Sequence, residues 1–302
     1  MDPLVSVITV NYNQVVYTLE LLESLRHTAY KNIEVIVVDN GSRENPEPII
    51  REKYPEVKVI VSPENLGFAG GNNLGIRAAT GKYLFFLNND TEVDQNTFAP
   101  LVQLFETTPG AGMASPKILY YNSGEVIQYV GCSSINPYTG RNHREGFKEV
   151  DAGQFDQLRV TDLVHGAAMM VPRRIIEEVG EMPEIFFLYY EELDWCESVK
   201  SRGYQVYVVP ESKIYHKESM SVGKNSTLKT YYMTRNRLLF MRRHTRGLKK
   251  LSWVVFFIIF SIPKNSLMFG LRRQVEHLRA FWKGLLWHVR HRSNGDRYSL
   301  FT

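Results

Sequence analysis

Cysteine is scarce in this chain. The two cysteines among 302 residues, Cys132 and Cys196, form neither a metal-binding spacing nor a disulfide framework, which fits a reducing compartment. The N-terminus has no basic stretch followed by an apolar core, so we expect no secretory signal. The apolar run 251–263 is shorter than the roughly 20 residues that a membrane-spanning helix needs. These absences favour a cytoplasmic protein without a spanning segment.

Acidic residues are scarce toward the C-terminus. From residue 229 onward there are sixteen Lys and Arg but only two acids, Glu276 and Asp296. The whole chain has 36 Lys and Arg and 32 Asp and Glu, so residues 1–228 contain twenty basic and thirty acidic residues. The net charge is therefore near −10 for residues 1–228 and near +14 for residues 229–302. We therefore expect a domain over residues 1–228 and a basic helical extension over residues 229–302.

The first ninety residues alternate between strand and helix patterns. Four short, almost wholly apolar runs are typical of strands buried on both faces. Helical spacing lies between the first two runs and again over residues 69–80. This alternation predicts an α/β fold with a parallel sheet covered on both faces. The predicted strands are residues 4–10, 33–39, 57–62 and 82–90. They are followed by a long loop with irregular strands over about 122–160, strands over 162–172 and 205–210, and a helix over 191–203.

Polar residues follow each of the four strands. Thr9, Asn11 and Tyr12 end the first, Asp39 ends the second, "PENLGFAGGNN" follows the third, and Asn88-Asn89-Asp90 follows the fourth. Ligands bind at the carboxyl ends of parallel strands, so four polar ends predict a binding crevice, although each alone is typical of a turn. The glycines of this region fit neither a dinucleotide fingerprint nor a P-loop.

Three acids follow an apolar run in "FFLYYEELDWCESVKSRGY", residues 186–204. Glu191, Glu192 and Asp194 at a helix start are explained by the helix dipole, and spacing alone favours that interpretation. The alternative is a general base, because the apolar wall and the neighbouring negative charges both raise the pKa of a carboxyl group.

Five motifs in order, "SVITVNYN", "VVDNGS", "NLGFAGGNN", "FFLNND" and the acidic run, resemble the inverting family 2 glycosyltransferases. The chain looks most like bacterial rhamnosyltransferase-type members, which build surface polysaccharides, over about residues 4–245. The resemblance implies a GT-A fold, in which a nucleotide-binding α/β layer is fused to an acceptor-binding half. It favours the catalytic interpretation of the acidic run.

The resemblance also implies roles for individual residues. Glu192 matches the catalytic base, with Glu191 and Asp194 beside it, and Asp90 and His216 match ligands of a Mg²⁺ or Mn²⁺ ion on the diphosphate. The expected nucleotide-sugar-binding residues are Thr9, Asn11, Tyr12, Asp39, Asn65, Gly71, Asn73, Asn88 and Asn89. Asn88 departs from the acid of the family's D-x-D motif, which predicts weaker metal binding and leaves most of it to Asp90. The sequence leaves open whether His216 is a metal ligand or an ordinary histidine at the end of a strand.

The implied activity is transfer of a sugar from a nucleotide diphosphate donor, of dTDP or UDP type, to a hydroxyl of a lipid-linked or growing cell-surface glycan. Rhamnose from dTDP-rhamnose is the leading guess, from resemblance only. One alternative is a nucleotidyltransferase on a similar fold, which needs a basic triphosphate loop that "NYNQVVYT" does not supply. The other is a non-catalytic scaffold that retains the fold.

The C-terminal extension mixes Arg, Lys and His with bulky apolar residues in "LMFGLRRQVEHLRAFWKGLLWHVRHR". This composition is typical of a helix lying in a membrane interface, and basic residues strengthen binding to an anionic leaflet. We expect peripheral attachment to the inner face of the cell membrane. The alternative is packing on the catalytic domain or on a second subunit of a homo-oligomer. Binding to nucleic acid is disfavoured, because the basic residues of the extension are interleaved with aliphatic side chains.

Overall fold

The structure is a computed structural model that describes residues 2–217 and 226–290. The chain divides into two units, Met1–Ser134 with Asn142–Ser221, and Ile135–Arg141 with Val222–Thr302. The last part of the expected basic extension, residues 291–302, lies outside the described residues. We describe each unit by itself.

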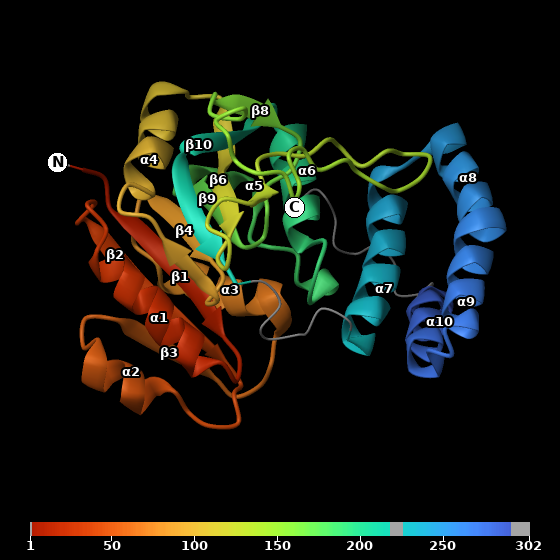
Figure 1. The fold of residues 1–302 in the computed structure, drawn as a ribbon, viewed down its shortest axis with the longest axis horizontal. Helices are drawn as coiled ribbons and strands as arrows, with labels where there is room; N and C mark the ends of the chain where they lie inside the picture. The colour runs from red at the N-terminus through yellow and green to blue at the C-terminus, as the bar shows by residue number, and fades with distance from the viewer. Residues whose placement is uncertain (1, 218–225, 291–302) are drawn as a thin grey trace. The chain divides into compact units, whose positions relative to one another are not determined.

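A ten-stranded sheet forms the centre of the first unit (Figure 1). Its first half is parallel, in the order β3-β2-β1-β4. These strands are β1 (Val5–Asn11), β2 (Ile33–Asn40), β3 (Lys58–Ser62) and β4 (Tyr83–Leu87). The central strands β1 and β4 are buried almost throughout, which is why they are continuous apolar runs and not alternating ones. The predicted α/β sheet is confirmed.

The other half of the sheet mixes strand directions. β9 runs antiparallel to β4 and β6, whereas β6 and β10 run parallel to each other. The remaining strands are β5 (Thr91–Val93), β6 (Ala111–Tyr120), β7 (Ile127–Tyr129), β8 (Arg159–Thr161), β9 (Ala168–Pro172) and β10 (Gln205–His216). The predicted strand over 162–172 is wrong in its first half, because residues 162–167 form a loop and only Ala168–Pro172 pairs with β4.

Helices cover both faces of this sheet. Phe85 of β4 packs edge-on against Phe98 of α4, with ring centroids 5.4 Å apart, and the next residue, Phe86, packs against Trp195 of α6 at 5.6 Å. Successive strand residues point to opposite faces, so α4 and α6 lie on opposite sides. The helices of this unit are α1 (Val15–Arg26), α2 (Glu47–Lys53), α3 (Gly67–Ala78), α4 (Phe98–Thr107), α5 (Arg173–Val179), the short 3₁₀ helix η1 (Glu184–Phe186) and α6 (Glu191–Ser201).

The described part of the second unit is helical. Its elements are α7 (Thr227–His244), α8 (Gly247–Phe256), the π-helical turn η2 (Phe257–Ser261), α9 (Ile262–Leu271) and α10 (Val275–Arg290). Gly284 of α10 lies close to α7, since a Cβ there would be 2.9 Å from the Tyr231 carbonyl oxygen. His288 Nε2 lies 2.8 Å from the Arg235 carbonyl oxygen, so a buried polar contact fixes this helix pair.

One helix of 25 residues, Gly247–Leu271, is formed by α8, η2 and α9 together. By length and composition it is able to cross a membrane, and only 11% of its most apolar stretch is buried. The expectation that the run 251–263 is too short to span is therefore wrong on length. The helix continues past Pro263, which has no N–H to donate and which lies two residues after the end of the π-helical turn η2, where the i→i−4 hydrogen-bond pattern is already interrupted.

Candidate functional site

Asp39 and Asn11 lie side by side at the carboxyl ends of β2 and β1. Asn11 Nδ2 donates to Asp39 Oδ1 at 2.8 Å, and Ser42 donates to the same carboxylate from Oγ at 2.5 Å and from its backbone N–H at 3.1 Å. Asp39 is only 1% exposed. Three donors on a buried carboxylate hold it in one orientation.

The same hydrogen-bond network extends to the end of β4. Thr18 Oγ1 of α1 donates to Asn11 Oδ1 at 3.0 Å, and Asn89 Nδ2 donates to Thr18 Oγ1 at 3.2 Å. The polar ends of β1, β2 and β4 are therefore one connected cluster, as the sheet topology predicts. Thr18 was not among the predicted residues, and no motif in the sequence marks it.

Asp90 and His216 form a second buried pair at this edge of the sheet. His216, the last residue of β10, places Nε2 at 3.1 Å from Asp90 Oδ1, and Gln128 Oε1 lies 2.8 Å from its Nδ1. When Nδ1–H donates to Gln128, a neutral imidazole directs its Nε2 lone pair at the carboxylate oxygen. Two electron-pair donors converging in this way fit a divalent cation.

The protein supplies few ligands to such a cation. Over residues 2–217 and 226–290, no group of three or more His, Cys, Asp or Glu side chains is arranged to hold a metal. Mg²⁺ is commonly bound by one or two carboxylates, with substrate phosphates and water completing its shell. Asp90 and His216 fit that incomplete shell, and Asn88, two residues from Asp90, is partly exposed.

Glu192 differs from the two acids beside it. Glu191 and Asp194 are 3% and 1% exposed, whereas Glu192 is only partly buried. Its Oε2 atom is nevertheless buried and has no hydrogen-bond partner in the described part of the chain. Burial raises the pKa of Glu192 to about 7, against the backbone N–H groups of Glu192, Tyr190 and Leu193, which lower it. Of the three acids, Glu192 is the one that a ligand is able to reach.

A short loop connects Glu192 with the Asp90–His216 pair. Gly166 lies in front of the Glu192 carboxyl group, since a Cβ at Gly166 would be 3.6 Å from Glu192 Cδ. The neighbouring His165 ring lies 6.1 Å from the His216 ring, centroid to centroid. Burial lowers the pKa of His165 to about 3, so His165 is neutral.

The backbone just before α6 is unusual. Phe187, Tyr189 and Tyr190 have φ angles of 64°, 69° and 79°, a left-handed region that non-glycine residues rarely adopt. The Phe187 carbonyl oxygen accepts from the backbone N–H of Phe68, at the start of α3, at 2.6 Å. Backbone strain of this kind persists only where surrounding contacts hold it, and it occurs here directly before Glu192.

Asn73 of α3 also holds this segment. Its Nδ2 donates to the Met182 carbonyl oxygen at 3.0 Å and to Glu184 Oε1 at 2.8 Å, while its Oδ1 accepts from the Met182 backbone N–H at 3.0 Å. Asn73 is 2% exposed. The side chain thus connects α3 to the residues that lead into α6.

The comparisons with known proteins identify the family. The sequence profile of Glycosyl transferase family 2 matches residues 6–180, more than half of the chain. The chain belongs to glycosyl transferase family 2. This glycosyltransferase is 24% identical over 314 residues to dTDP-rhamnosyl transferase RfbF of Shigella flexneri, covering 99% of the chain and 100% of that protein. It is 21% identical over 251 residues to the N-acetylglucosaminyl-diphospho-decaprenol L-rhamnosyltransferase of Mycobacterium tuberculosis, covering 74% and 80%.

Another relative and a solved structure are similar to this chain over different fractions of their own length. The chain is 28% identical over 251 residues to protein y4gI of Sinorhizobium fredii; the match covers 80% of the chain but only 27% of that longer protein. Among solved structures, the mannosyltransferase PcManGT of Pyrobaculum calidifontis, in complex with GDP-Man and Mn²⁺, matches with a TM-score of 0.57 at 17% identity, over 96% of this chain and 76% of that one. The glycosyltransferase has the GT-A fold, so the expected family and fold are confirmed.

The other predicted donor-binding residues of the glycosyltransferase lie in differing environments. Tyr12 is 40% exposed and Asn65 is exposed, so both are accessible to a ligand. Thr9 is fully buried, and its Oγ1 has no hydrogen-bond partner within residues 2–217 and 226–290. Gly71 packs against Val10, whose Cγ1 would be 2.9 Å from a Cβ at this position. Contacts of these residues and of Asn73 with a nucleotide remain predictions.

Proposed function

We propose that this protein is an inverting hexosyltransferase, with Glu192 as general base. The observation that carries the proposal is the arrangement of three acids. Hydrogen bonds lead from Asp39 through Asn11 and Thr18 to Asn89, the residue before Asp90. Asp90 pairs with His216, and Glu192, the acid left accessible, lies beside Gly166. The acceptor is a hydroxyl group of a lipid-linked or growing glycan. The donor is a nucleotide diphosphate sugar.

Glu192 takes the proton of the acceptor hydroxyl as its oxygen attacks the anomeric carbon. The bond between that carbon and the diphosphate oxygen breaks as the new bond forms on the opposite face, which inverts the configuration. A positioned base accelerates such a step by roughly 10²- to 10⁴-fold, most effectively with a pKa near the working pH. A pKa of about 7 suits Glu192 to this role.

Asp90 and His216 hold a divalent cation in this proposal. When bound, the cation neutralises charge on the leaving diphosphate as a Lewis acid. GalNAc-T7 and PcManGT, two solved structures of the same fold, contain Mn²⁺ with a nucleotide or nucleotide sugar. In this proposal Asp39, which Asn11 and Ser42 hold in one orientation, binds the donor's base.

The same proposal also specifies the sugar donor and the cellular location of the enzyme. Similarity to a dTDP-rhamnosyl transferase and to a rhamnosyltransferase named for a diphospho-decaprenol acceptor supports dTDP-rhamnose and a lipid-linked acceptor. Such an acceptor places the enzyme at the cytoplasmic face of the cell membrane. The exposed apolar residues of the Gly247–Leu271 helix supply the membrane contact.

A donor screen tests the function. The full chain is heated with dTDP-rhamnose, UDP and GDP sugars, each with and without Mg²⁺ or Mn²⁺, and the product anomer is assigned by NMR. We expect one donor to raise the melting temperature in a metal-dependent way and to give a product of opposite configuration. If no nucleotide sugar stabilises the protein with either metal, the proposal is wrong.

Gln128 provides a test of the cation site. Gln128→Ala should raise the metal concentration for half-maximal transfer by roughly 10- to 100-fold, because the partner that orients a ligating histidine is lost. The rate at saturating metal should largely recover. Gln103→Ala, an exposed glutamine on α4, is the matched control. Equal metal dependence in both variants would exclude His216 as a ligand positioned by Gln128.

A further inference from the structure

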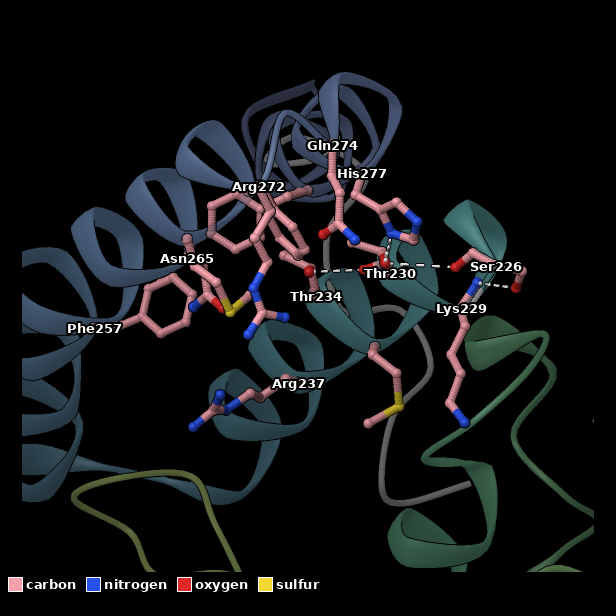
Figure 2. Close-up of a pocket in the computed structure, with 14 residues that line it drawn as sticks. Ser226, Lys229, Thr230, Thr234, Arg237, Phe257, Asn265, Arg272, Gln274 and His277 are labelled. Atoms are coloured by element: carbon pink, nitrogen blue, oxygen red, sulfur yellow. Dashed lines mark hydrogen bonds between the residues drawn. The ribbon is translucent and has the colours of Figure 1, made fainter. Parts of the chain in front are cut away.

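The helical unit contains a pocket of about 390 Å³ between α7, the Gly247–Leu271 helix and α10 (Figure 2). Among its lining residues, Thr230 of α7 places Oγ1 2.8 Å from Nδ1 of His277 of α10, so this polar pair joins two of the helices. We assign no ligand to this pocket. A turn in the first unit, residues 165–168, carries the stronger indication of a ligand.

This turn lies between the cation side and the base side of the proposed site. On one side, the Ala167 carbonyl oxygen accepts from the backbone N–H of Asn88, at the end of β4, at 2.9 Å. On the other side, a Cβ at Gly166 would be 3.6 Å from Oε1 of Glu192. In the proposed reaction the transferred sugar occupies the same interval, because its anomeric carbon is joined to the diphosphate and is attacked by the acceptor hydroxyl. We therefore expect the turn to border the sugar.

The residues that lead into the turn are fixed by elements that also carry the site. The backbone N–H of Val164 donates to Sγ of Cys196 at 3.4 Å, and Cys196 belongs to α6, the helix of the proposed base. The hydroxyl group of Tyr129, on β7, donates to the carbonyl oxygen of Leu163. A group held in place before the substrate arrives binds it with little loss of conformational entropy.

A hydrogen bond inside the turn decides which nitrogen of the His165 ring carries the proton. The backbone N–H of Ala167 donates to His165 Nδ1 at 3.1 Å, so Nδ1 is the acceptor and the proton of the neutral ring is on Nε2. Among residues 2–217 and 226–290, no acceptor lies within hydrogen-bond distance of this Nε2–H group, and the His165 side chain is partly exposed. The ring lies 6.1 Å from the ring of His216, centroid to centroid. The turn thus presents an N–H donor next to the proposed cation ligand.

A neutral N–H donor suits a sugar hydroxyl group. The hydroxyl oxygen accepts one hydrogen bond and its own proton remains free for another partner. In the proposed mechanism the charge of the diphosphate is neutralised by the cation, so that part of the donor already has its partner. Sites that hydrogen-bond a substrate hydroxyl discriminate against analogues that lack it.

We propose that His165 donates a hydrogen bond from Nε2–H to a hydroxyl group of the sugar being transferred, and thereby helps to select the donor sugar. The proposal rests on the proposed function, because it presumes a sugar donor. His165 takes no proton from the acceptor, which is the role of Glu192, and its contact with the sugar is non-covalent.

Two substitutions separate this contact from a purely structural role of the turn. His165→Asn places an amide oxygen where Nδ1 lies, so the hydrogen bond from Ala167 is kept and the Nε2–H donor is lost. His165→Gln places an amide N–H near the position of Nε2, so the donor is kept and the hydrogen bond inside the turn is lost. Contact with the sugar predicts weaker donor binding in the asparagine variant than in the glutamine variant. A role confined to the turn predicts the reverse order.

Titration calorimetry of the full chain with Mn²⁺ measures this contrast. The probes are dTDP-rhamnose and dTDP or, should the donor screen select another nucleotide sugar, that donor and its nucleoside diphosphate. His165→Asn should weaken binding of the nucleotide sugar by roughly 3- to 10-fold, as expected for one neutral hydrogen bond, and leave binding of the nucleotide unchanged. His165→Gln should restore most of the loss. His27→Asn, the same change at an exposed histidine after α1, is the control and should alter neither affinity.

Donors that lack one hydroxyl group identify the group that is contacted. In the wild-type chain, removal of the contacted hydroxyl should weaken binding by the same factor, roughly 3- to 10-fold. In His165→Asn its removal should cost nothing further, because the contact is already absent. If every such donor loses the same factor in both proteins, the proposal is wrong. Equal losses for dTDP and dTDP-rhamnose in His165→Asn would place the contact at the diphosphate and would also overturn it.

The outcome separates this proposal from the proposed function. If the wild-type chain binds and transfers a nucleotide sugar while His165→Asn has unchanged sugar affinity, only the role of His165 is rejected. If the wild-type chain binds no nucleotide sugar, both are rejected. Melting temperatures establish that the variants are folded. Should His165→Asn fail to fold, His165→Phe takes its place, because it also lacks the donor and keeps an aromatic ring beside Tyr129.

Discussion

Replacement of Glu192 by glutamine should lower the rate of sugar transfer by about 10²- to 10⁴-fold, the range that a general base contributes. Glutamine preserves the size and polarity of the side chain but does not accept the acceptor's proton. Donor affinity should change little, because Glu192 faces the acceptor hydroxyl in this mechanism. The measurements are kcat from nucleotide release and donor Kd from titration calorimetry.

Glu197→Gln is the matched control for this variant. Glu197 lies on the same helix, α6, and pairs with Lys200 at 2.8 Å. The substitution removes the same charge from a partly exposed position, so transfer should be retained. If Glu192→Gln proved as active as Glu197→Gln, Glu192 would not be the base. Asp194, the next acid of the run, is 1% exposed and would need a structural change to reach a substrate.

The pH dependence of transfer follows from the burial of Glu192. A base must be ionised to act, and burial raises the pKa of this carboxyl group to about 7. We therefore expect kcat/KM to rise with pH through about 7 and then to level off, because the ionised fraction increases as pH exceeds the pKa. The profile is measured from about pH 5 to about pH 9. A flat profile over this interval would show a base with an ordinary carboxyl pKa.

The parallel half of the sheet was predictable because its strands are chemically distinctive. β1 and β4 are buried almost throughout, so selection for burial leaves continuous apolar runs that resemble neither helices nor half-exposed strands. Because parallel strands run in the same direction, their carboxyl ends all lie at one edge of the sheet. The predicted clustering of polar strand ends depended on this rule and not on any single motif.

Residues 98–120 show where such reasoning fails. They form α4 and the ten-residue strand β6, for which the sequence carried no expectation. β6 contains Gly112 and Pro116, residue types that are depleted in strands. A Cβ at Gly112 would lie 2.7 Å from Tyr204 Cβ, so the glycine is there for close packing and not for strand propensity. Tertiary contacts of this kind leave no local signal.

The candidate site also contains residues that the sequence predicted and residues that it did not. Asp39, Asp90 and Glu192 stand out because each acid lies at or within three residues of the end of an apolar run. In the fold Asp39 is linked by hydrogen bonds to Asn89, the residue before Asp90, and Glu192 lies beside Gly166. Gln128, which contacts His216, is 88 residues away in sequence and lies within a stretch expected to be a long loop with irregular strands, whose pairing partners the sequence did not predict. The position of Gln128 depends on the pairing of β7 with β6, which no residue spacing in the sequence predicts.

Gly67→Ala should destabilise the fold by about 2–5 kcal/mol, the sum of left-handed backbone strain and overpacking. Gly67 has a φ of 75°, and a Cβ there would overlap the Phe187 carbonyl oxygen and lie 2.7 Å from two ring carbons of Phe187. Urea unfolding measures this cost. Because Phe187 belongs to the strained segment before Glu192, transfer should also fall sharply at temperatures where the variant remains folded.

Gly203→Ala separates the two contributions to that cost. Gly203 also has a positive φ, 88°, but nothing lies within 4 Å of a Cβ at this position, so its variant carries the backbone strain without the overlap. We expect a loss of about 1–2 kcal/mol with transfer retained. If both variants lose equal stability and equal activity, contact between Gly67 and Phe187 does not position Glu192. A larger loss of transfer in Gly67→Ala alone means that the start of α3 holds the base in place across the sheet edge.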